Sequence, residues 1–357
     1  MLVYISMYKV HPALAPAAFA AGILYEAFIR ARNGLYAQGL PHQHRLTKPV
    51  ISIGNITMGG SGKTPMVIHV ARILAELGFV PAILSRGYGR DKPGQEHIVP
   101  PGEKIPAAEA TLGDEPALIR RHLPFVWMGI SKNRCLAGAV ISRQPMRAAF
   151  LLDDGFQHRR LHRDLDIVII DSSQPLASNH VFPRGTLREP LSELRRCHVV
   201  VINGEPESAP PVESEVRNIH PSVRIYHCRQ KIRALVPFAS WQLGQGPAEH
   251  SGGALSAFLA AALGNPERFR RDVRQLGIDV RGVRFFRDHY PIRPKDWLAC
   301  AAEAHNKRAD ALIITEKDAV KISHPPDFPL LVAVQETGMA DGQGFQGVLR
   351  DCLKECE

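Results

Sequence analysis

Short apolar runs alternate with longer amphipathic stretches along most of the chain. From Pro49 onward the pattern predicts buried strands at Val50–Ile53, Ala82–Leu84, Ala149–Leu152, Ile167–Ile170 and Val199–Ile202. Several of these runs are continuous rather than alternating, as expected when helices cover both faces of a parallel sheet. The pattern therefore predicts an α/β fold with a doubly wound core.

A second α/β segment follows a polar stretch. Residues 204–222 contain four prolines and several Glu and Ser residues, which makes them the best candidate for a domain boundary. Beyond it we expect strands at Val223–Tyr226, Ala234–Pro237, Ala257–Ala261, Val283–Phe286 and Ala311–Ile314, and helices around Pro266–Leu276 and from Pro294. We therefore divide the chain into an N-terminal helix (residues 1–40), a core domain (41–222) and a smaller C-terminal α/β domain (223–357).

The N-terminal segment predicts an apolar helix. No charged residue occurs from Pro12 to Tyr25, and the apolar character continues through Ile29. The run is short for a membrane span, which needs about 20 apolar residues. Its positive charge comes mainly after the apolar part, unlike that of a secretory signal. A helix lying on an anionic membrane surface fits this pattern; a helix packed on the protein's own core is the alternative.

The composition narrows the class of partner. The 357 residues carry a formal net charge of +9, and 45% of them are hydrophobic. These values suit a globular protein with anionic partners, such as nucleotides, phosphorylated substrates or an acidic membrane. No recognition motif supports binding of nucleic acid. The six cysteines form no CxxC pair, so they indicate reduced thiols rather than a disulfide framework or a zinc site.

The strongest motif lies between the first predicted strand and a predicted helix over residues 66–77. Residues 54–64 read GNITMGGSGKT. A glycine-rich loop in this context lets backbone N–H groups converge on phosphate oxygens at the start of a helix. Lys63 would reach the β- and γ-phosphates, and the Thr64 hydroxyl would bind Mg²⁺. The expected nucleotide-binding residues are Gly59, Gly60, Ser61, Gly62, Lys63 and Thr64.

The motif departs from the strict phosphate-binding loop at one position. Thr57 stands where the strict form has a glycine. Gly54 or the pair Gly59–Gly60 can supply the turn instead. A glycine-rich surface loop without a ligand is the alternative interpretation.

Two pairs of adjacent carboxylates are the next candidates. Asp153 and Asp154 end an apolar strand, where P-loop enzymes hold Mg²⁺; a strand-end turn is the alternative. Asp114 and Glu115 precede a helical stretch and could act on an attacking hydroxyl. An N-cap is the alternative for Asp114.

Three further segments are weaker signals. Arg86 and Arg90 lie between glycines after a strand, which suits either anion binding or a solvated loop. His289 follows Asp288 in a predicted loop, where a lone histidine is more often a structural or surface residue. The segment Thr315–Asp318 follows a strand and indicates a capped helix start.

Taken together, the motifs resemble those of the tetraacyldisaccharide 4′-kinase family, the lipid A 4′-kinases of Gram-negative bacteria. The resemblance follows the chain in order and covers nearly all of it. Besides the Gly54–Pro65 segment, it rests on SRGY (85–88), GDEP (113–116), LDDGFQH (152–158), PRGTLREP (183–190), GNPERF (264–269), DH (288–289) and TEKD (315–318). Each motif alone is weak, whereas the ordered set is specific. Ala262 stands where the family commonly has a glycine.

The resemblance implies a reaction and a setting. ATP would donate its γ-phosphoryl group to the 4′-hydroxyl of tetraacyldisaccharide 1-phosphate, giving lipid IVA. It implies a P-loop domain joined by a short β linker to a smaller α/β domain, with the site in the cleft. The N-terminal helix would associate with the cytoplasmic face of the inner membrane, peripherally or monotopically. The expected cofactors are ATP and Mg²⁺, no nucleic-acid partner is expected, and a monomer is expected.

The resemblance also assigns roles to residues. Asp114 would act as the base and His289 would orient it, while Lys63 would bind phosphate. Asp153 and Asp154 would lie near the metal, and which of the two contacts it stays open. The metal candidates are Thr64, Asp153, Asp154 and Glu115, and the substrate-binding candidates are Arg86, Arg134, Gln157, His158, Arg188 and Glu189. Arg86 and Arg90 are the candidates for contacting the 1-phosphate.

Two other functions stay open on the sequence alone. The first is a soluble P-loop kinase for a small phosphorylated metabolite, and the apolar N-terminal helix argues against it. A nucleotide-driven switch that docks at the membrane needs no acceptor site. The guanine-reading Asn-Lys-x-Asp element is not visible in the sequence, which disfavours a GTPase.

Overall fold

Among the described residues, a sheet of twelve strands forms the centre of the protein. The computed structural model describes residues 15–92, 94–106, 108–174, 176, 179–244, 255–287, 290 and 292–356. The strand order is β10-β9-β11-β12-β8-β7-β6-β1-β5-β2-β4-β3. The strands are β1 (Val50–Asn55), β2 (Val80–Ser85), β3 (His97–Val99), β4 (Trp127–Ile130), β5 (Ala148–Asp153), β6 (Leu165–Asp171), β7 (Val199–Asn203), β8 (Arg224–Pro237), β9 (Ser256–Ala262), β10 (Asp279–Phe286), β11 (Ala311–Thr315) and β12 (Leu330–Met339).

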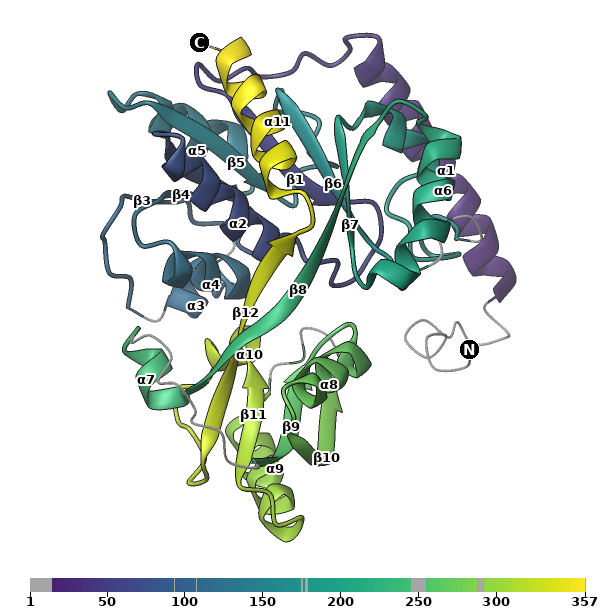
Figure 1. Ribbon diagram of the computed structural model, residues 1–357. Coiled ribbons are helices and arrows are strands. Elements are labelled where there is room, and N and C mark those ends of the chain that lie inside the picture. The colour runs from purple at the N-terminus through teal and green to yellow at the C-terminus, as the bar shows by residue number, and fades with distance from the viewer. Residues whose placement is uncertain are drawn as a thin grey trace.

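Helices cover both faces of this sheet, as the continuous apolar strands predict (Figure 1). Strands β1, β5 and β6 have no exposed residue, because α-helices and loops shield them on both sides. The α-helices are α1 (Ala15–Ala37), α2 (Lys63–Glu76), α3 (Ala108–Leu112), α4 (Asp114–His122), α5 (Arg134–Ser142), α6 (Ala209–Ile219), α7 (Phe238–Gln242), α8 (Pro266–Gln275), α9 (Pro294–Asn306), α10 (Glu316–Ala319) and α11 (Gly342–Glu355), with short 3₁₀ helices at Leu191–Arg196 and Pro206–Ser208.

Two lobes share the sheet. The N-terminal lobe contains β1–β7 with their helices, and the C-terminal lobe contains β9–β11 with α7–α10. The antiparallel pair β8 and β12 runs from one lobe to the other (Figure 1). Cys228 of β8 packs in the core of the N-terminal lobe, whereas Val236 at its far end packs in that of the C-terminal lobe. The pair is therefore the β linker that the family resemblance implies.

The segment after β7 is better ordered than its composition suggests. We predicted residues 204–222 as a loose boundary, but most of this segment forms α6. Prolines occupy the first turn of that helix, where the missing N–H group costs nothing. Val212 and Val216, one turn apart, are buried against the sheet. The prolines therefore start a helix here.

The sequence analysis did not predict three of the strands, and it divided one long strand into two. β3, β4 and β12 were not predicted. The expected strands Val223–Tyr226 and Ala234–Pro237 are the two ends of β8, which continues through the polar residues between them. Antiparallel pairing with β12 sustains this stretch where the apolar pattern stops.

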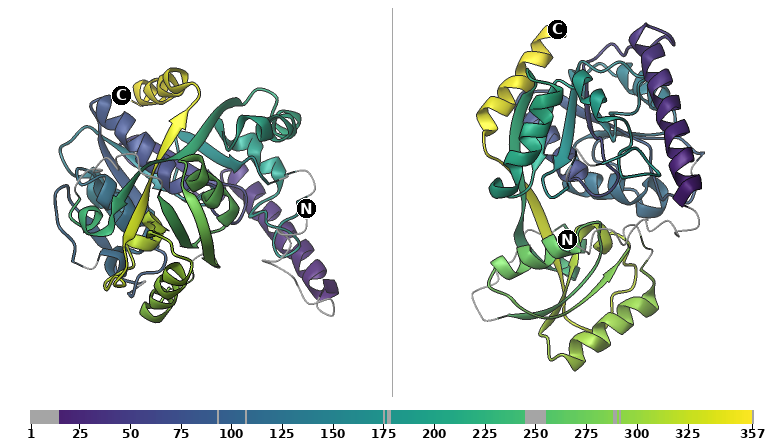
Figure 2. Two further views of the ribbon diagram at one scale, coloured as in Figure 1. Left: turned by 60° about the horizontal axis from the view of Figure 1, so that its bottom comes forward. Right: turned by 90° about the vertical axis from the view of Figure 1, so that its right-hand side faces the viewer.

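The last helix returns to the N-terminal lobe. Phe345 and Leu349 of α11 are fully buried in the same core cluster as Val67 and Leu74 of α2. Figure 2 shows α11 (yellow) and α1 (purple) on opposite sides of that lobe. The division of the chain at residues 222 and 223 stays a prediction, and α11 lies on the lobe that precedes that division.

Helix α1 lies along one flank of the N-terminal lobe with many of its apolar side chains exposed (Figures 1 and 2). Gly22, Ile29 and Asn33 form its buried stripe, and a Cβ atom at Gly22 would collide with the Arg184 side chain. Leu24 and Phe28 are 72% and 64% exposed. No described helix is long and apolar enough to cross a membrane.

Candidate active site

One large cavity opens between the two lobes. Its volume is about 1370 Å³. The cavity is lined by α1, the loop before α2, the carboxyl ends of β2 and β5, the start of α4, and residues of α8, α10 and β12. The carboxyl edge of a parallel sheet is where α/β proteins usually bind ligands.

The glycine-rich loop lines this cavity and leads directly into α2. Gly59 and Gly62 adopt φ angles of +105° and +93°, a region that favours glycine. Thr57 instead pairs with Leu187 in an isolated bridge. The turn therefore starts at Gly59, and the missing glycine at position 57 is not needed. The predicted nucleotide-binding residues, Gly59, Gly60, Ser61, Gly62, Lys63 and Thr64, all line the cavity.

Asp154 lies at the centre of a cluster of cations. Its carboxylate accepts hydrogen bonds of 2.7 and 2.8 Å from Arg188 Nη1, and it lies 3.6 Å from Lys63 Nζ. Burial would raise the pKa of Asp154, but Lys63 and Arg188 outweigh burial and lower it. Its φ of +48° is unusual for a residue other than glycine. Such strain persists at functional sites because surrounding contacts hold it.

Asp153 has the opposite environment. It is 2% exposed, and one of its oxygens accepts a 2.9 Å hydrogen bond from the Ser85 hydroxyl. Burial, followed by repulsion from Glu115 and Asp154, raises the pKa of Asp153 to about 7. Its other oxygen, Oδ1, is buried and has no hydrogen-bond partner among the described residues. A buried carboxylate oxygen of this kind calls for a cation or a proton.

This donor set fits Mg²⁺. The ion is typically held by one or two carboxylates and completes its octahedron with water and phosphate oxygens. Thr64, Asp153, Asp154 and Glu115 all line the cavity. In the described part of the chain, no three His, Cys, Asp or Glu side chains are placed to hold a metal on their own.

The two acids at the start of α4 face different surroundings. Glu115 lines the cavity, whereas Asp114 is not among the lining residues. Asp114 Oδ2 lies 2.7 Å from Lys321 Nζ, which comes from the segment after α10 in the C-terminal lobe. The structure therefore brings Asp114 to the junction of the lobes, at the edge of the cavity. His289, its predicted partner, and Asp288 lie outside the described residues.

Arg134 contacts the backbone of both strand-end aspartates. It is 8% exposed, and its Nη1 donates to the backbone carbonyl oxygens of Asp153 and Asp154 at 3.1 and 3.4 Å. Arg134 lines the cavity, and in the part of the chain that the structure describes its buried Nε has no hydrogen-bond partner. The side chain therefore supports the acidic turn and brings a positive charge close to it.

Gln157 and His158 also line the cavity. Gln157 donates to the carbonyl oxygen of Asn55 at 2.9 Å, which ties the turn after β5 to the end of β1. Burial, together with nearby arginines, lowers the pKa of His158 to about 3. His158 is therefore neutral at physiological pH, and its buried Nε2 atom has no hydrogen-bond partner within the described segments. It can exchange a hydrogen bond with a bound group but carries no charge.

The two arginines of the segment after β2 lie in different environments. Arg86 is exposed and lines the cavity. Arg90 is 6% exposed, donates to the carbonyl oxygen of Ile130 and does not line the cavity. Arg86 is therefore the one placed to meet an anion.

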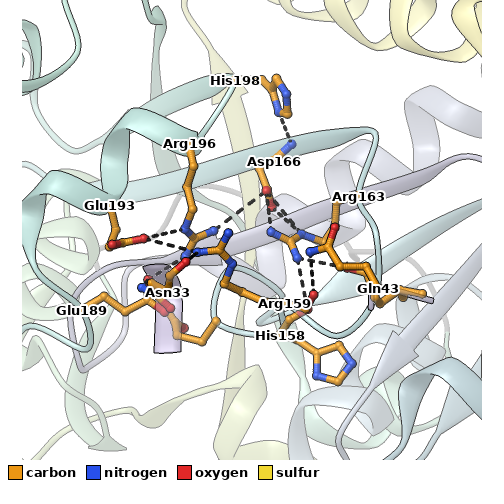
Figure 3. A network of polar contacts seen from close by, with 12 residues as sticks. Asn33, Gln43, His158, Arg159, Arg163, Asp166, Glu189, Glu193, Arg196 and His198 are labelled. Atoms are coloured by element: carbon orange, nitrogen blue, oxygen red, sulfur yellow. Dashed lines mark hydrogen bonds and ion pairs between the residues drawn. The ribbon is translucent and has the colours of Figure 1, made fainter. Parts of the chain in front are cut away.

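Glu189 is buried away from the cavity, which the sequence did not indicate. It is fully buried and does not line the cavity. Arg32 of α1 donates to one of its oxygens at 2.9 Å. Asn33 and Arg196 donate to the other oxygen at 3.4 and 2.6 Å (Figure 3). The prediction of direct substrate contact therefore does not agree with this placement. Glu189 anchors α1 because a buried carboxylate needs several partners.

Several residues at the site escaped the sequence analysis. Ser85 contacts Asp153, Lys321 contacts Asp114, and the side chains of Asn203 and Gln230 contact the glycine-rich loop. Arg268 in turn contacts Asn203. Asn203 ends the apolar run VVVIN, so a polar residue at a strand end was a usable signal. Lys321 carries no such signal, because it lies in a turn after α10.

Comparisons with known proteins agree along nearly the whole chain. The model of the family described as "Tetraacyldisaccharide-1-P 4'-kinase" matches residues 12–354. The tetraacyldisaccharide 4'-kinase of Geobacter metallireducens is 37% identical over 304 residues, 84% of this chain and 86% of the relative. That of Geobacter sulfurreducens is 38% identical over 302 residues, 84% and 82% of the two chains. The crystal structure of LpxK from Aquifex aeolicus, titled as an "apo" form in complex with ATP, has a TM-score of 0.73 and 27% identity, and the match covers 96% of this chain and 98% of that one.

Proposed function

The chain belongs to the tetraacyldisaccharide-1-P 4′-kinase family, and on that premise we propose that its interlobe cavity is the active site. The protein is an ATP-dependent kinase of lipid A biosynthesis. It transfers the γ-phosphate of ATP to the 4′-hydroxyl of tetraacyldisaccharide 1-phosphate. The roles of individual residues, the metal and the membrane are the proposal.

The continuity of the cavity is the observation that carries the proposal. The same cavity wall contains Lys63 of the glycine-rich loop, Asp154 at the end of β5 and Ile29 of α1. A nucleotide in the loop would therefore share one enclosed space with an amphipathic substrate that enters along α1. Phosphoryl transfer depends mainly on such positioning and on charge neutralisation.

The phosphate end of the cavity supplies the positive charge. Backbone N–H groups of the loop, together with Lys63, would bind the phosphates of ATP. Mg²⁺ would be held by Thr64 and the strand-end aspartates, with Glu115 as a further candidate ligand that lines the same cavity. A bound Mg²⁺ would neutralise negative charge on the β- and γ-phosphates. Asp153 would have to lose its proton to bind the metal, because burial keeps its pKa near 7.

The acceptor end needs a group that takes up a proton. As the bond forms between the 4′-oxygen and the γ-phosphorus, the bond from that phosphorus to the β–γ bridging oxygen breaks. The hydroxyl proton would pass to Asp114, with ADP as the leaving group. Asp114 lies where the lobes meet, so small lobe movements would bring it to the acceptor. We propose His289 as the residue that orients it.

The acceptor itself would be held by residues of the N-terminal lobe. Arg86 is the exposed guanidinium available for an anionic group of the substrate, such as its 1-phosphate. His158, neutral and with an unpaired nitrogen, suits a sugar hydroxyl. Gln157, Arg134 and Arg188 complete this wall of the cavity.

Helix α1 would hold the enzyme at the cytoplasmic face of the inner membrane as a peripheral or monotopic protein. Leu24, Phe28 and Leu35 repeat at helical spacing, and all three are well exposed. An exposed apolar stripe of this kind suits insertion into the acyl boundary of an anionic membrane. Acyl chains of the substrate would then enter the cavity past Tyr25 and Ile29. We propose that the enzyme works as a monomer.

Phosphoryl transfer in detergent micelles tests the function. Wild type should move the γ-phosphate of labelled ATP to tetraacyldisaccharide 1-phosphate. Lys63→Ala should lose this activity, whereas Lys354→Ala, an exposed lysine of α11, should retain it. A wild-type enzyme that hydrolyses ATP but leaves the lipid untouched would refute the assignment.

Vesicle binding tests the membrane proposal separately. Leu24→Ser should reduce sedimentation with vesicles of phosphatidylglycerol and phosphatidylethanolamine. Leu298→Ser on α9 is the matched control, because Leu298 is 60% exposed in the other lobe and Leu24 is 72% exposed. Equal binding of both variants and wild type would exclude α1 as the membrane contact.

A further inference from the structure

The segment GNPERF (264–269) has no role in the reaction as described so far. It forms the start of α8 in the C-terminal lobe. Asn265 caps this helix by accepting a 3.2 Å hydrogen bond from the Arg268 N–H group, and Pro266 occupies the first turn. The cap fixes the first turn of α8 and thereby the origin of the Arg268 side chain.

The glycine-rich loop is held from behind by two amide side chains. Asn203 Nδ2 at the end of β7 donates to the Ser61 carbonyl oxygen at 2.9 Å. Gln230 Nε2 of β8 donates to the Gly62 carbonyl oxygen at 3.3 Å. Both side chains are buried, and a Cβ atom at Gly62 would lie 2.0 Å from Gln230 Nε2 and 2.6 Å from Asn203 Nδ2. Glycine is required here by this close contact as well as by its φ angle.

These two bonds, together with the 3.3 Å hydrogen bond from the Met66 N–H group to the Gly62 carbonyl oxygen, fix where the loop directs its N–H groups. In a planar trans peptide the C=O and N–H bonds point in opposite directions. Holding the carbonyl oxygens of Ser61 and Gly62 toward Asn203 and Gln230 therefore turns the N–H groups of Gly62 and Lys63 the other way. Converging N–H groups at a helix start are what binds phosphate.

Arg268 connects this support to the other lobe. Its Nη2 donates to Asn203 Oδ1 at 3.4 Å and to the Gln230 carbonyl oxygen at 3.5 Å. The first of these bonds orients the Asn203 amide, since it engages the oxygen and leaves the nitrogen for Ser61. Arg268 lies 3.8 Å from Asp272, one turn further along α8, which steadies the guanidinium.

We propose that Arg268 is a positioning residue through which the C-terminal lobe controls the affinity of the glycine-rich loop for the phosphates of ATP. Any lobe position that preserves the contact of Arg268 with Asn203 favours ATP binding. By linkage, bound ATP favours that lobe position to the same extent. The inference rests on the proposed nucleotide site and goes beyond it.

Equilibrium binding in the absence of lipid tests the proposal. The probe is a fluorescent N-methylanthraniloyl derivative of ATP with Mg²⁺. Arg268→Gln should raise its Kd about tenfold, within the range typical of coupled sites. The kcat for lipid at saturating ATP should stay within about threefold of wild type. The matched control is Arg270→Gln on the same helix, and it should leave Kd unchanged. Arg270 lies 3.8 Å from Glu267 of its own helix.

Variants of Asn203 separate positioning from general stability. Asn203→Asp keeps an acceptor for Arg268 but removes the donor to Ser61, so it should weaken ATP binding as much as Asn203→Ala does. The double variant Asn203→Ala/Arg268→Gln should bind no more weakly than Asn203→Ala, because Arg268 acts through Asn203. If Arg268→Gln does not fold, Arg268→Lys provides the same comparison, since lysine lacks the forked donor.

The outcomes distinguish this inference from the function on which it rests. A Kd for Arg268→Gln within twofold of wild type, or additive effects of the two substitutions, would overturn the role of Arg268 and leave the kinase assignment intact. A wild-type protein that does not bind the ATP probe, with Lys63→Ala no weaker, would instead overturn the nucleotide site.

Discussion

The two pairs of adjacent carboxylates that line or border the cavity are held in different ways. Asp153 and Asp154 end β5, and their partners Ser85, Lys63 and Arg188 all come from the N-terminal lobe. Asp114 and Glu115 start α4, and Asp114 is paired with Lys321 of the C-terminal lobe. The first pair is complete within one lobe, whereas the second pair depends on both.

With the roles proposed above, this difference separates binding from reaction. A site built inside one lobe can hold phosphate and metal whatever the other lobe does. A group whose partner comes across the cleft changes its surroundings whenever the lobes move. We therefore expect changes at the strand-end pair to remove activity altogether, and changes at the helix-start pair to act through lobe closure.

Asp154→Asn should have the largest effect. The amide cannot balance the charges of Lys63 and Arg188, which both contact this carboxylate. We expect kcat/KM to fall about 10³-fold or more, as when an electrostatic group at a transition state is lost. Asp327→Asn, an exposed aspartate, is the control. Activity of the Asp154 variant within tenfold of wild type would contradict this expectation.

Asp114→Asn should come next. Loss of a general base typically costs about 10²- to 10⁴-fold in rate. We expect kcat to fall about 100-fold with little change in the KM for ATP, because Asp114 is not among the residues lining the cavity. Steady-state kinetics with lipid in micelles measures both constants. A rise in the KM for ATP with unchanged kcat would make Asp114 a binding residue instead.

Lys321→Gln should have a smaller effect that depends on Asp114. Removal of the lysine frees the carboxylate from its 2.7 Å contact across the cleft. We expect kcat to fall by about threefold to tenfold, since one cross-lobe ion pair contributes modestly. In the Asp114→Asn background the same change should add little. Fully additive effects would show that Lys321 acts elsewhere.

Asp318→Asn should alter stability rather than activity. It tests the effect of burying a carboxylate that has no proposed role in the reaction. Asp318 is fully buried in the C-terminal lobe, and burial raises its pKa to about 6 although Thr315 and the Ala262 N–H group donate to it. An aspartate in the unfolded chain has a pKa of about 3.9. Between these values the unfolded chain loses its proton first, so rising pH favours unfolding.

Wild type should therefore lose up to about 3 kcal/mol from this group between pH 4 and pH 7, and Asp318→Asn should not. Urea unfolding at several pH values measures the difference. A difference in unfolding free energy between variant and wild type that does not change with pH would disprove this account.

The strand-end site was predictable from sequence because its parts are local. Lys63 and Thr64 follow a strand, Asp153 and Asp154 end another, and the carboxyl ends of parallel strands meet at one edge of a sheet. The α/β fold with its β linker was likewise predicted correctly. The short strand β3 and the polar half of β8 were missed, because partner strands sustain them where the apolar pattern does not.

Pairings between distant segments were not predictable. Glu189 resembled a cleft residue, but the approach of α1 buries it beneath Arg32 and Asn33. Arg90 and Arg86 are equivalent in their motif, yet only Arg86 faces the cavity. Their environments depend on which elements pack against them.

The sequence by itself determined the glycine-rich loop before α2, the order of acidic motifs and the class of the sheet, because each follows from neighbouring residues and from strand periodicity. Only the tertiary structure decided that Asp153 is buried with a raised pKa, that Asp114 is paired with Lys321, and that Arg268 supports the loop through Asn203. The physical reason is that solvation and charge pairing depend on contacts across space, and the chain brings those partners together only when both lobes fold.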